Sequence, residues 1–247
     1  MNRPRLPDST FWVEPEAVGP RHIRLGEEES HHLIRVHRAI TGTPFQATDG
    51  RGGFFECVLE SIEPRGAVGR IVERREGWGE LSRAIELLVG RPDWAAAEKV
   101  VEHGVPLGAG AFDFVVCERR GQEGPGAARL ARLDRVARAG LKQSRRSRLP
   151  RILSSPSIQE AVRALGPGQR FVADPDGSPF ASSLAENPQL PVQLAIGPPG
   201  DFTAEEREFL RGEDFAPISL GPSRLTTETA AIALLSLIRN SLLRSKL

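Results

Sequence analysis

Residues 195–206 read "AIGPPGDFTAEE", and this segment is the strongest indication of the fold class. An apolar run typical of a buried strand ends in a loop with two glycines and two prolines. Thr203 and Glu206 then form the sequence pattern of a helix-capping box. A strand, a glycine-containing loop and a helix in this order are typical of a parallel α/β sheet, whose ligands bind beyond the carboxyl ends of the strands. Residues 218–229, "ISLGPSRLTTET", repeat this order, so we expect the two loops to share one ligand pocket.

From residue 80 onward the sequence alternates between segments typical of strands and segments typical of helices. We expect strands at 84–90, 112–118, 170–174, 192–197 and 216–220. We expect helices at 93–104, 127–143, 157–165, 203–210 and 226–243. Asp93 and Gly104 are the expected start and stop signals of one helix, and Ser157 with Glu160 is a second capping box. Elements of these lengths predict a mostly parallel α/β sheet.

The first 75 or so residues have a different pattern, which predicts a small β-barrel. Short strands are expected at 11–13, 22–25, 44–49, 53–62 and 67–74, with a hairpin turn at 49–53. One helix interrupts them, in which Leu33, Val36, His37 and Ile40 share a face, and Gly42 ends it. With "EGWGE" (76–80) as the linker, the predicted domains are residues 1–76 and 80–247.

Composition excludes several classes of protein. Of the 247 residues, 39% are hydrophobic and 26% charged, which is ordinary for a globular chain with a core. No apolar run approaches the roughly 18 residues of a membrane helix, and the first residues lack the apolar centre of a signal peptide. The two cysteines, Cys57 and Cys117, are far apart in sequence and fit a reducing compartment. We therefore expect a cytoplasmic protein.

Charge is distributed unevenly along the chain. Residues 1–78 carry 11 Lys and Arg against 12 Asp and Glu, residues 119–151 carry 11 against 2, and the remainder carries 11 against 18. The basic segment "KQSRRSRLPR" (142–151) has five cations and no acid. This density favours a polyanion such as nucleic acid as the partner, with a solvated arginine-rich helix end as the alternative.

Common ligand motifs are missing from the sequence. There is no GxGxxG after the first strand of the α/β half, no GxxxxGK[ST], no HExxH, no CxxC pair and no GxSxG. Their absence argues against a Rossmann dinucleotide site, a P-loop, a recognisable metal site and a serine nucleophile elbow. The two glycine-proline loops remain as the candidate ligand site.

Five motifs, in order along nearly the whole chain, resemble those of the RsmE family. They are "HHLIRVHRAITG" (31–42) with "DG" (49–50), "AAEKVVEHGV" (96–105), "KQSRRSRLP" (142–150), "IGPPGDFTAEE" (196–206) and "SLGPSRLTTETAAIALL" (219–235). This family consists of SPOUT-class RNA methyltransferases that methylate N3 of a uridine in small-subunit (16S) ribosomal RNA. The resemblance implies a PUA-like barrel followed by a trefoil-knotted α/β domain.

The resemblance also implies S-adenosylmethionine as the cofactor and a homodimer. The missing metal-binding motifs lead us to expect no metal. The helix at 227–243 is a candidate for the dimer interface, with an intrachain core as the alternative. The residues expected to bind the cofactor are Ala173, Asp174, Ile196, Gly197, Pro198, Gly200, Leu220, Gly221, Leu225 and Thr229. The residues expected to bind ribosomal RNA or the small subunit are Arg35, Arg38, Lys142, Arg145, Arg146 and Arg148.

Methyl transfer requires alignment of the reacting groups and loss of the uracil N3 proton, which a base or nearby cations would assist. The loops depart from the family at several positions. Lys142, Arg145, Pro199, Asp201, Ser223 and Thr226 stand where the family has Glu, Gly, Glu, Gly, Arg and Arg. Arg224 is therefore the candidate replacement cation, and Glu228 the candidate orienting acid.

Two other functions stay open beside the methyltransferase. One is a catalytically degenerate RNA-binding paralogue that acts in ribosome assembly. The other is an α/β enzyme that uses a different nucleotide.

Overall fold

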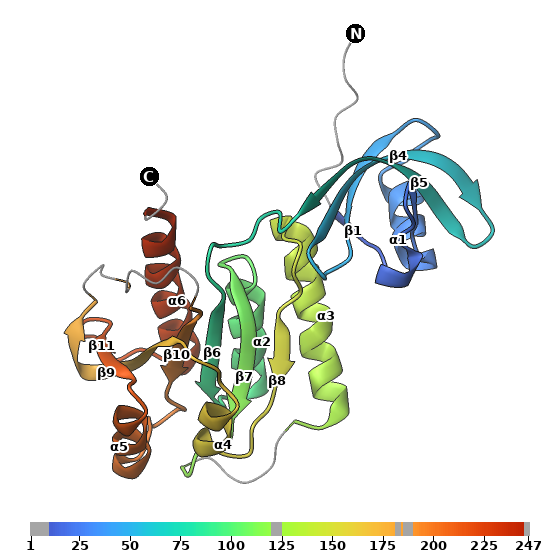
Figure 1. The fold of residues 1–247 in the computed structure, drawn as a ribbon. Coiled ribbons are helices and arrows are strands. Elements are labelled where there is room, and N and C mark those ends of the chain that lie inside the picture. The colour runs from blue at the N-terminus through green and yellow to red at the C-terminus, as the bar shows by residue number, and fades with distance from the viewer. Residues whose placement is uncertain (1–9, 120–124, 181–183, 185–189, 245–247) are drawn as a thin grey trace. The chain divides into compact units, whose positions relative to one another are not determined.

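A computed structural model describes residues 10–119, 125–180, 184 and 190–244 of the chain (Figure 1). Contacts divide the chain into two compact units. The first unit comprises the residues up to Glu80 together with Arg138–Leu149, and the second comprises Leu81–Ala137 together with the residues from Pro150 onward. The two units are defined by residue contacts, and the first takes in residues 138–149 from the second predicted domain. The predicted domain boundaries, 1–76 and 80–247, therefore stay a prediction.

The first unit is a five-stranded sheet with helical turns. In chain order its elements are β1 (Thr10–Trp12), η1 (Pro15–Ala17), β2 (His22–Arg24), α1 (Glu27–His31), the π-helical turn η2 (His32–Val36), β3 (Pro44–Thr48), β4 (Gly53–Glu63) and β5 (Gly66–Glu76). The sheet order is β1-β3-β4-β5-β2, and only the β1–β3 pair is parallel. All five predicted strands are confirmed, while their closure into a barrel stays a prediction.

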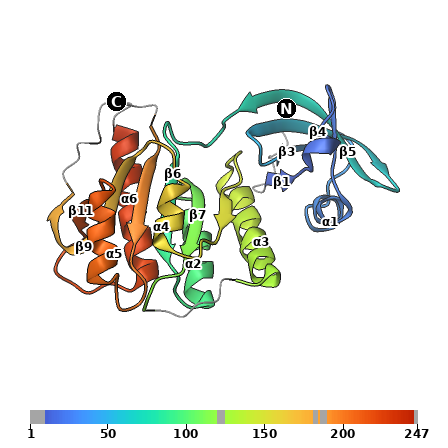
Figure 2. The same cartoon turned by 60° about the horizontal axis from the view of Figure 1, so that its bottom comes forward.

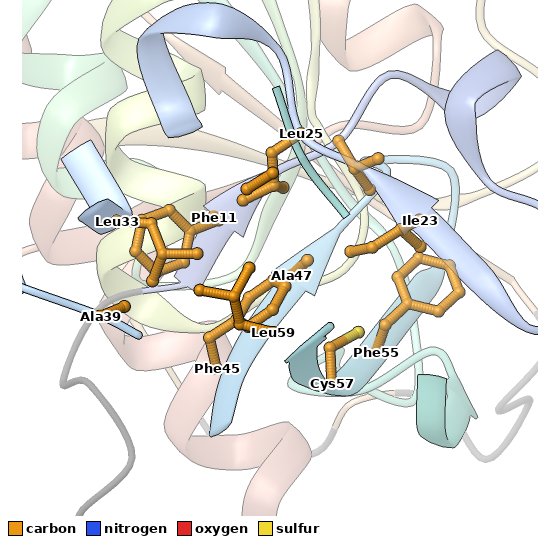
Figure 3. Packing of buried hydrophobic residues seen from close by; sticks show 12 residues of the cluster. Phe11, Ile23, Leu25, Leu33, Ala39, Phe45, Ala47, Phe55, Cys57 and Leu59 are labelled. Atoms are coloured by element: carbon orange, nitrogen blue, oxygen red, sulfur yellow. The ribbon is translucent and has the colours of Figure 1, made fainter. Parts of the chain in front are cut away.

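The core of the first unit is apolar and comes from every part of its sheet (Figure 3). Phe11, Phe45 and Phe55 are fully or almost fully buried in it. The predicted hairpin turn at 49–53 is confirmed, because Asp49 Oδ1 accepts hydrogen bonds from the backbone amides of Arg51, at 2.8 Å, and Gly53, at 2.9 Å.

The predicted apolar helix face in this unit is partly wrong. Leu33 is buried, but Val36 is 60% exposed and Ile40 72% exposed. The cause is the π-helical turn, which widens the helix and breaks the 3.6-residue spacing on which the prediction relied. The helix also ends at Val36 and not at Gly42, and Arg38 takes a left-handed conformation with φ +53°.

The second unit contains a six-stranded sheet in which every pair is parallel (Figure 2). Its elements are β6 (Ile85–Gly90), α2 (Trp94–Gly104), β7 (Ala109–Val115), α3 (Ala127–Ser144), β8 (Arg151–Leu153), α4 (Ile158–Arg163), β9 (Gln169–Pro179), β10 (Val192–Ile196), α5 (Ala204–Gly212), β11 (Ala216–Ser219) and α6 (Thr227–Arg244). The last residues of α3 belong to the first unit. The sheet order is β11-β9-β10-β6-β7-β8, so the predicted parallel α/β sheet is confirmed.

Helices cover both faces of this sheet. Buried residues of α4 and α5, among them Ile158 and Leu210, pack in one cluster with Leu88, Val115 and Val172 of the strands. On the opposite face α2 contacts α6, β7 lies against α2, and β10 and β6 lie against α6. Because helices cover both faces, the side chains on both sides of a central strand are buried. Such a strand is therefore a continuous apolar run in the sequence.

The caps and ends of the elements agree with the sequence in most places. Asp93 accepts a hydrogen bond from Ala96 N at 2.9 Å, and Thr203 with Glu206 forms the complete capping box. At Ser157 the side chain accepts from Glu160 N at 3.2 Å. The three-residue strand β8 was not predicted, because it is too short to give a pattern.

Candidate functional site

The loop that follows β10 is a rigid turn at the carboxyl edge of the parallel sheet. Asp201 N donates a hydrogen bond to Pro198 O at 2.7 Å, which closes a four-residue turn. Pro199 and Gly200 occupy its central positions, and Gly200 has φ +93°. This arrangement is typical of a type II turn, which favours proline and then glycine at these positions. Proline in place of the family's glutamate therefore stiffens the loop.

The two predicted ligand loops are in direct contact. Thr227, at the start of α6, donates from Oγ1 to the carbonyl oxygen of Gly197, 3.0 Å away, and its side chain is buried. The end of β6 packs against the same place, because a Cβ atom on Gly90 would lie 2.4 Å from the nitrogen of Pro198. The ends of β10 and β6 and the start of α6 thus meet around Gly197 and Pro198. The two loops touch, while their sharing of one ligand pocket stays a prediction.

Asp201 takes a strained conformation where the family has glycine. Its φ is +68°, in the left-handed region. Oδ1 accepts from Phe202 N at 2.7 Å, and Oδ2 accepts from Arg207 Nη1 at 2.9 Å. Its side chain also restricts Gly197, since a Cβ atom there would lie 2.5 Å from Oδ1. Asp201 is therefore part of the structure of this loop.

The second loop leads from β11 into α6. Gly221 has φ +103°, and no atom lies within 4 Å of the position where a Cβ would stand. Leu220 and Leu225 are half-buried, whereas Arg224 is exposed. Among the described residues no carboxylate forms an ion pair with Arg224. Gly221 and Arg224 are thus both exposed on this loop, where the backbone and a cation are accessible to a ligand.

Thr226 replaces a family arginine with a helix cap. Its Oγ1 lies 2.9 Å from Oγ1 of Thr229 and 3.4 Å from the backbone nitrogen of Thr229. The carbonyl of Thr226 accepts from Ala230 N at 2.9 Å. Glu228 is half-buried in the first turn of α6, where the helix dipole favours an acid. The two predicted catalytic residues, Arg224 and Glu228, therefore lie on the same loop and helix start.

The strand that contains Ala173 and Asp174 does not end at residue 174, where the sequence predicted its end. Strand β9 continues to Pro179, because its second half pairs with β11 after a register shift, with Ser178 opposite Ile218. Asp174 is buried and its Oδ1 accepts from Asp176 N at 2.9 Å. A long strand was missed because proline and glycine at 175–179 read as a loop.

Sequence reasoning also missed the turn that follows β7. Glu118 N donates to Oε1 of the buried Glu206 at 3.1 Å, and Glu206 Oε2 accepts from Thr203 N at 2.8 Å. The guanidinium of Arg119 donates to the carbonyl oxygen of Gly200. The position directly after a strand's carboxyl end is the signal that could have pointed to Arg119.

Burial raises the pKa of neighbouring Cys117 to about 12, so this thiol stays protonated.

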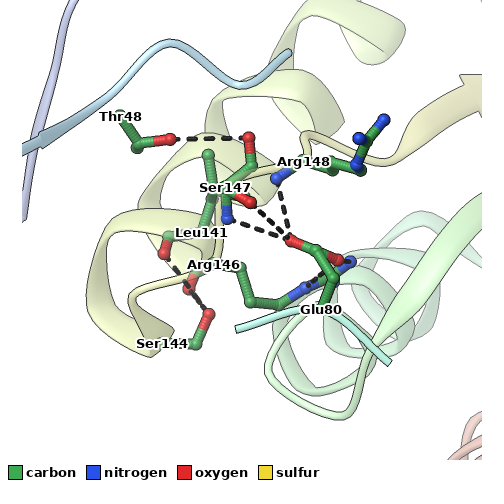
Figure 4. A network of polar contacts seen from close by, with 8 residues as sticks. Thr48, Glu80, Leu141, Ser144, Arg146, Ser147 and Arg148 are labelled. Carbon is green, nitrogen blue, oxygen red and sulfur yellow. Dashed lines mark hydrogen bonds and ion pairs between the residues drawn. The ribbon is translucent and has the colours of Figure 1, made fainter. Parts of the chain in front are cut away.

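The basic segment is partly a structural feature of the first unit (Figure 4). Arg146, only 3% exposed, donates from Nη2 and Nε to Glu80 Oε2 at 2.6 and 3.2 Å. Glu80 Oε1 accepts from the backbone nitrogens of Ser147, at 2.9 Å, and Arg148, at 2.8 Å. The expectation that Arg146 meets RNA phosphates therefore has to be corrected, since its guanidinium is enclosed by protein.

The other predicted RNA-binding cations are more accessible. Arg148 is exposed and pairs with the exposed Glu76 at 3.1 Å, and Lys142 forms an ion pair with Glu29. Arg145 is exposed and has φ +56° at a position where the family has glycine. Arg35 and Arg38 are exposed on the segment that contains the π-helical turn. These cations belong to the first unit, and the two ligand loops to the second.

Family models match both units of the chain. An RNA methyltransferase domain matches residues 79–239, and an RNA methyltransferase PUA domain matches residues 25–72. The chain belongs to the RNA methyltransferase family. The resemblance and the fold class predicted from the motifs, a PUA-like domain followed by an α/β domain with a parallel sheet, are thereby confirmed. The predicted trefoil knot stays a prediction.

Individual relatives extend over most of the chain. The ribosomal RNA small subunit methyltransferase E of Synechocystis sp. is 29% identical over 238 residues, 94% of this chain and 77% of that protein. A crystal structure of a probable rRNA methyltransferase from Porphyromonas gingivalis is 27% identical, with a TM-score of 0.82, and the match covers 96% of this chain and 99% of that one. A ribosomal RNA small subunit methyltransferase E from Neisseria gonorrhoeae, solved bound to S-adenosylmethionine, is 22% identical with a TM-score of 0.82, covering 94% and 97%.

None of the helices in the described part of the chain is both long enough and apolar enough to cross a membrane.

Proposed function

We propose that this RNA methyltransferase uses S-adenosylmethionine to methylate N3 of a uridine in small-subunit (16S) ribosomal RNA. The observation that carries the proposal is the hydrogen bond from Thr227 to Gly197, which joins the two glycine-proline loops at the carboxyl edge of a parallel sheet. The family match and the S-adenosylmethionine found in a structure of the same fold support the cofactor.

The residues of the edge fit this cofactor. Gly200 and Gly221 have left-handed backbones and open space where a side chain would begin, so backbone amides and carbonyls can approach a ligand closely. Other residues that would line the site are Ile196, Gly197, Pro198, Leu220, Leu225 and Thr229. When bound, S-adenosylmethionine supplies an electrophilic methyl group on a sulfonium. The loops hold and orient the cofactor and the base, and most of the catalysis is positioning.

The uracil needs more than positioning, because its N3 carries a proton. Loss of this proton leaves negative charge on O2 and O4, which a fixed cation stabilises. Arg224 is an exposed cation on the second loop, and Glu228 is the acid that would orient it or the base. Thr226 cannot take this role, since its side chain is neutral and caps α6.

RNA would bind in part through the first unit. Lys142, Arg145 and Arg148 of the basic segment and Arg35 and Arg38 are the proposed phosphate contacts. We also propose a cytoplasmic homodimer that associates through α6, on which Leu237 and Leu243 are 39% and 43% exposed.

One observation favours a second candidate function, the catalytically degenerate RNA-binding paralogue. Thr226 has exchanged the family's arginine for a helix cap, so a charge has been lost at the proposed site. Such a paralogue would bind RNA, and act in ribosome assembly, without transferring a methyl group.

The test uses the purified protein, radiolabelled S-adenosylmethionine and small ribosomal subunits or naked 16S RNA that lack the modification. We expect methyl transfer, and mass mapping of the product should locate one N3-methyluridine. Binding of both S-adenosylmethionine and RNA without transfer would support the paralogue. Failure to bind S-adenosylmethionine in calorimetry would reject both functions and favour a different ligand for the same edge.

A further inference from the structure

Arg119 is an exposed arginine that reaches the first ligand loop from a different strand. It lies in the turn directly after β7, and its guanidinium donates a hydrogen bond to the carbonyl oxygen of Gly200. Strand β6 lies between β7 and β10 in the sheet, so this contact spans the end of β6. Arg119 therefore belongs to the same edge of the second unit as Gly197 and Gly200.

The position of Arg119 is held from two sides. Its side chain is fixed by Gly200, and the preceding residue is fixed by the hydrogen bond from Glu118 N to Glu206. Glu206 is itself buried and accepts from Thr203 N at the start of α5. A charge held in place in this way needs little reorganisation when a ligand arrives, which is what electrostatic catalysis requires.

The charge of Arg119 remains uncompensated within the described residues. A carbonyl oxygen satisfies one of the five N–H donors of a guanidinium but carries no formal charge. No carboxylate in the described part of the chain forms an ion pair with Arg119, whereas the neighbouring Arg207 is paired with Asp201 at 2.9 Å. The remaining donors of Arg119 are thus available to an anionic ligand at this edge.

We propose that Arg119 is a substrate-contacting cation that binds an anionic oxygen of the RNA beside the methyl-transfer site. This inference rests on the proposed function and adds a second cation to it, in a chain where Thr226 stands at the family's arginine position. The oxygen is either O2 or O4 of the uracil as its N3 proton leaves, or a phosphate next to the target nucleotide.

The experiment compares the wild-type protein with Arg119→Gln and Arg119→Lys. Glutamine keeps one donor for the Gly200 carbonyl but has no charge, and lysine keeps the charge. Arg163→Gln is the matched control, because Arg163 is an exposed arginine on the last turn of α4, which precedes β9 and so lies at the opposite edge of the sheet. Single-turnover methyl transfer, RNA affinity at several salt concentrations and S-adenosylmethionine affinity are measured for each protein.

We expect Arg119→Gln to lower transfer, Arg119→Lys to recover part of it, and S-adenosylmethionine affinity to stay unchanged. A rate about 10²–10³-fold lower with an unchanged salt slope identifies the uracil oxygen. Weaker RNA binding with a log–log salt slope smaller by about 0.7 identifies the phosphate.

Three results would overturn the proposal. The first is an Arg119→Gln variant that equals the wild type and the Arg163→Gln control in both methyl transfer and RNA binding. The second is a loss of S-adenosylmethionine affinity by the same factor as the rate, which would mean that Arg119 acts only by holding the Gly200 loop. A wild-type protein that transfers no methyl group would reject the proposed function itself, and the role of Arg119 in it would fall at the same time.

Discussion

Replacing Arg146 by methionine should destabilise the first unit strongly. The change keeps most of the aliphatic side chain but removes the two guanidinium hydrogen bonds to Glu80 Oε2, at 2.6 and 3.2 Å. The side chains of Arg146 and Glu80 are only 4% and 13% exposed, so the carboxylate would be left partly buried without its cation. Breaking a buried pair on one side costs about 3–5 kcal/mol. We expect the lower end of this range, because Ser147 N and Arg148 N continue to donate to Oε1.

The assay is urea unfolding followed by tryptophan fluorescence. Of the three tryptophans, Trp12 and Trp78 belong to the first unit and Trp94 to the second. In a Trp94→Phe background the fluorescence therefore reports on the first unit alone. A cycle that combines Arg146→Met with Glu80→Gln measures the coupling free energy of the pair.

The matched control is Arg148→Met, which breaks an exposed pair with Glu76. Its side chains are 56% and 70% exposed, so the loss should stay below about 1 kcal/mol. A small effect of Arg146→Met on unfolding, together with a clear loss of RNA affinity and a smaller salt slope, would contradict the structural role of Arg146. Arg146 would then reach phosphate, as the sequence first suggested.

The remaining predictions concern the ligand loops, the RNA surface and a buried acid. Gly221→Val should weaken S-adenosylmethionine binding at least tenfold, about 1.4 kcal/mol, because valine cannot adopt φ +103° without strain. Calorimetry checks this, and Gly212→Val, at the other edge of the sheet, should bind as the wild type does. Neutralising Arg145 and Arg148 together to glutamine should reduce the log–log salt slope of RNA binding by about 1.4, and an unchanged slope would assign them to a solvated surface. Burial raises the pKa of Asp113 in the folded protein, so the folded state binds this proton more tightly than the unfolded state does. The resulting contribution to the free energy of unfolding is present at low pH and is lost as the pH rises through the raised pKa. Urea unfolding should therefore show Asp113→Asn gaining stability relative to the wild type between about pH 4 and pH 7, and a change in the opposite direction would contradict the assignment.

The candidate site could be predicted from the sequence as far as local signals reach. Glycine, proline and capping residues mark the ends of β10 and β11, since turn geometry depends on a few neighbouring residues. The two corrected expectations about predicted ligand-binding residues involve distant partners. The buried state of Arg146 depends on Glu80, 66 residues away, and the continuation of β9 through Asp174 depends on pairing with β11.

The parallel sheet, the family and nearly the whole order of the elements could be predicted from the amino-acid sequence alone. Periodicity, caps and motifs are local properties, and each is readable without knowing which segments meet. Which charges are accessible to a ligand became clear from the three-dimensional contacts. Arg119 and Arg146 look equivalent in sequence, but Arg119 donates to a neutral carbonyl oxygen at the carboxyl edge of the parallel sheet, whereas Arg146 is buried against Glu80. A charge is compensated by whichever group lies a few ångströms away, and that neighbour is set by folding.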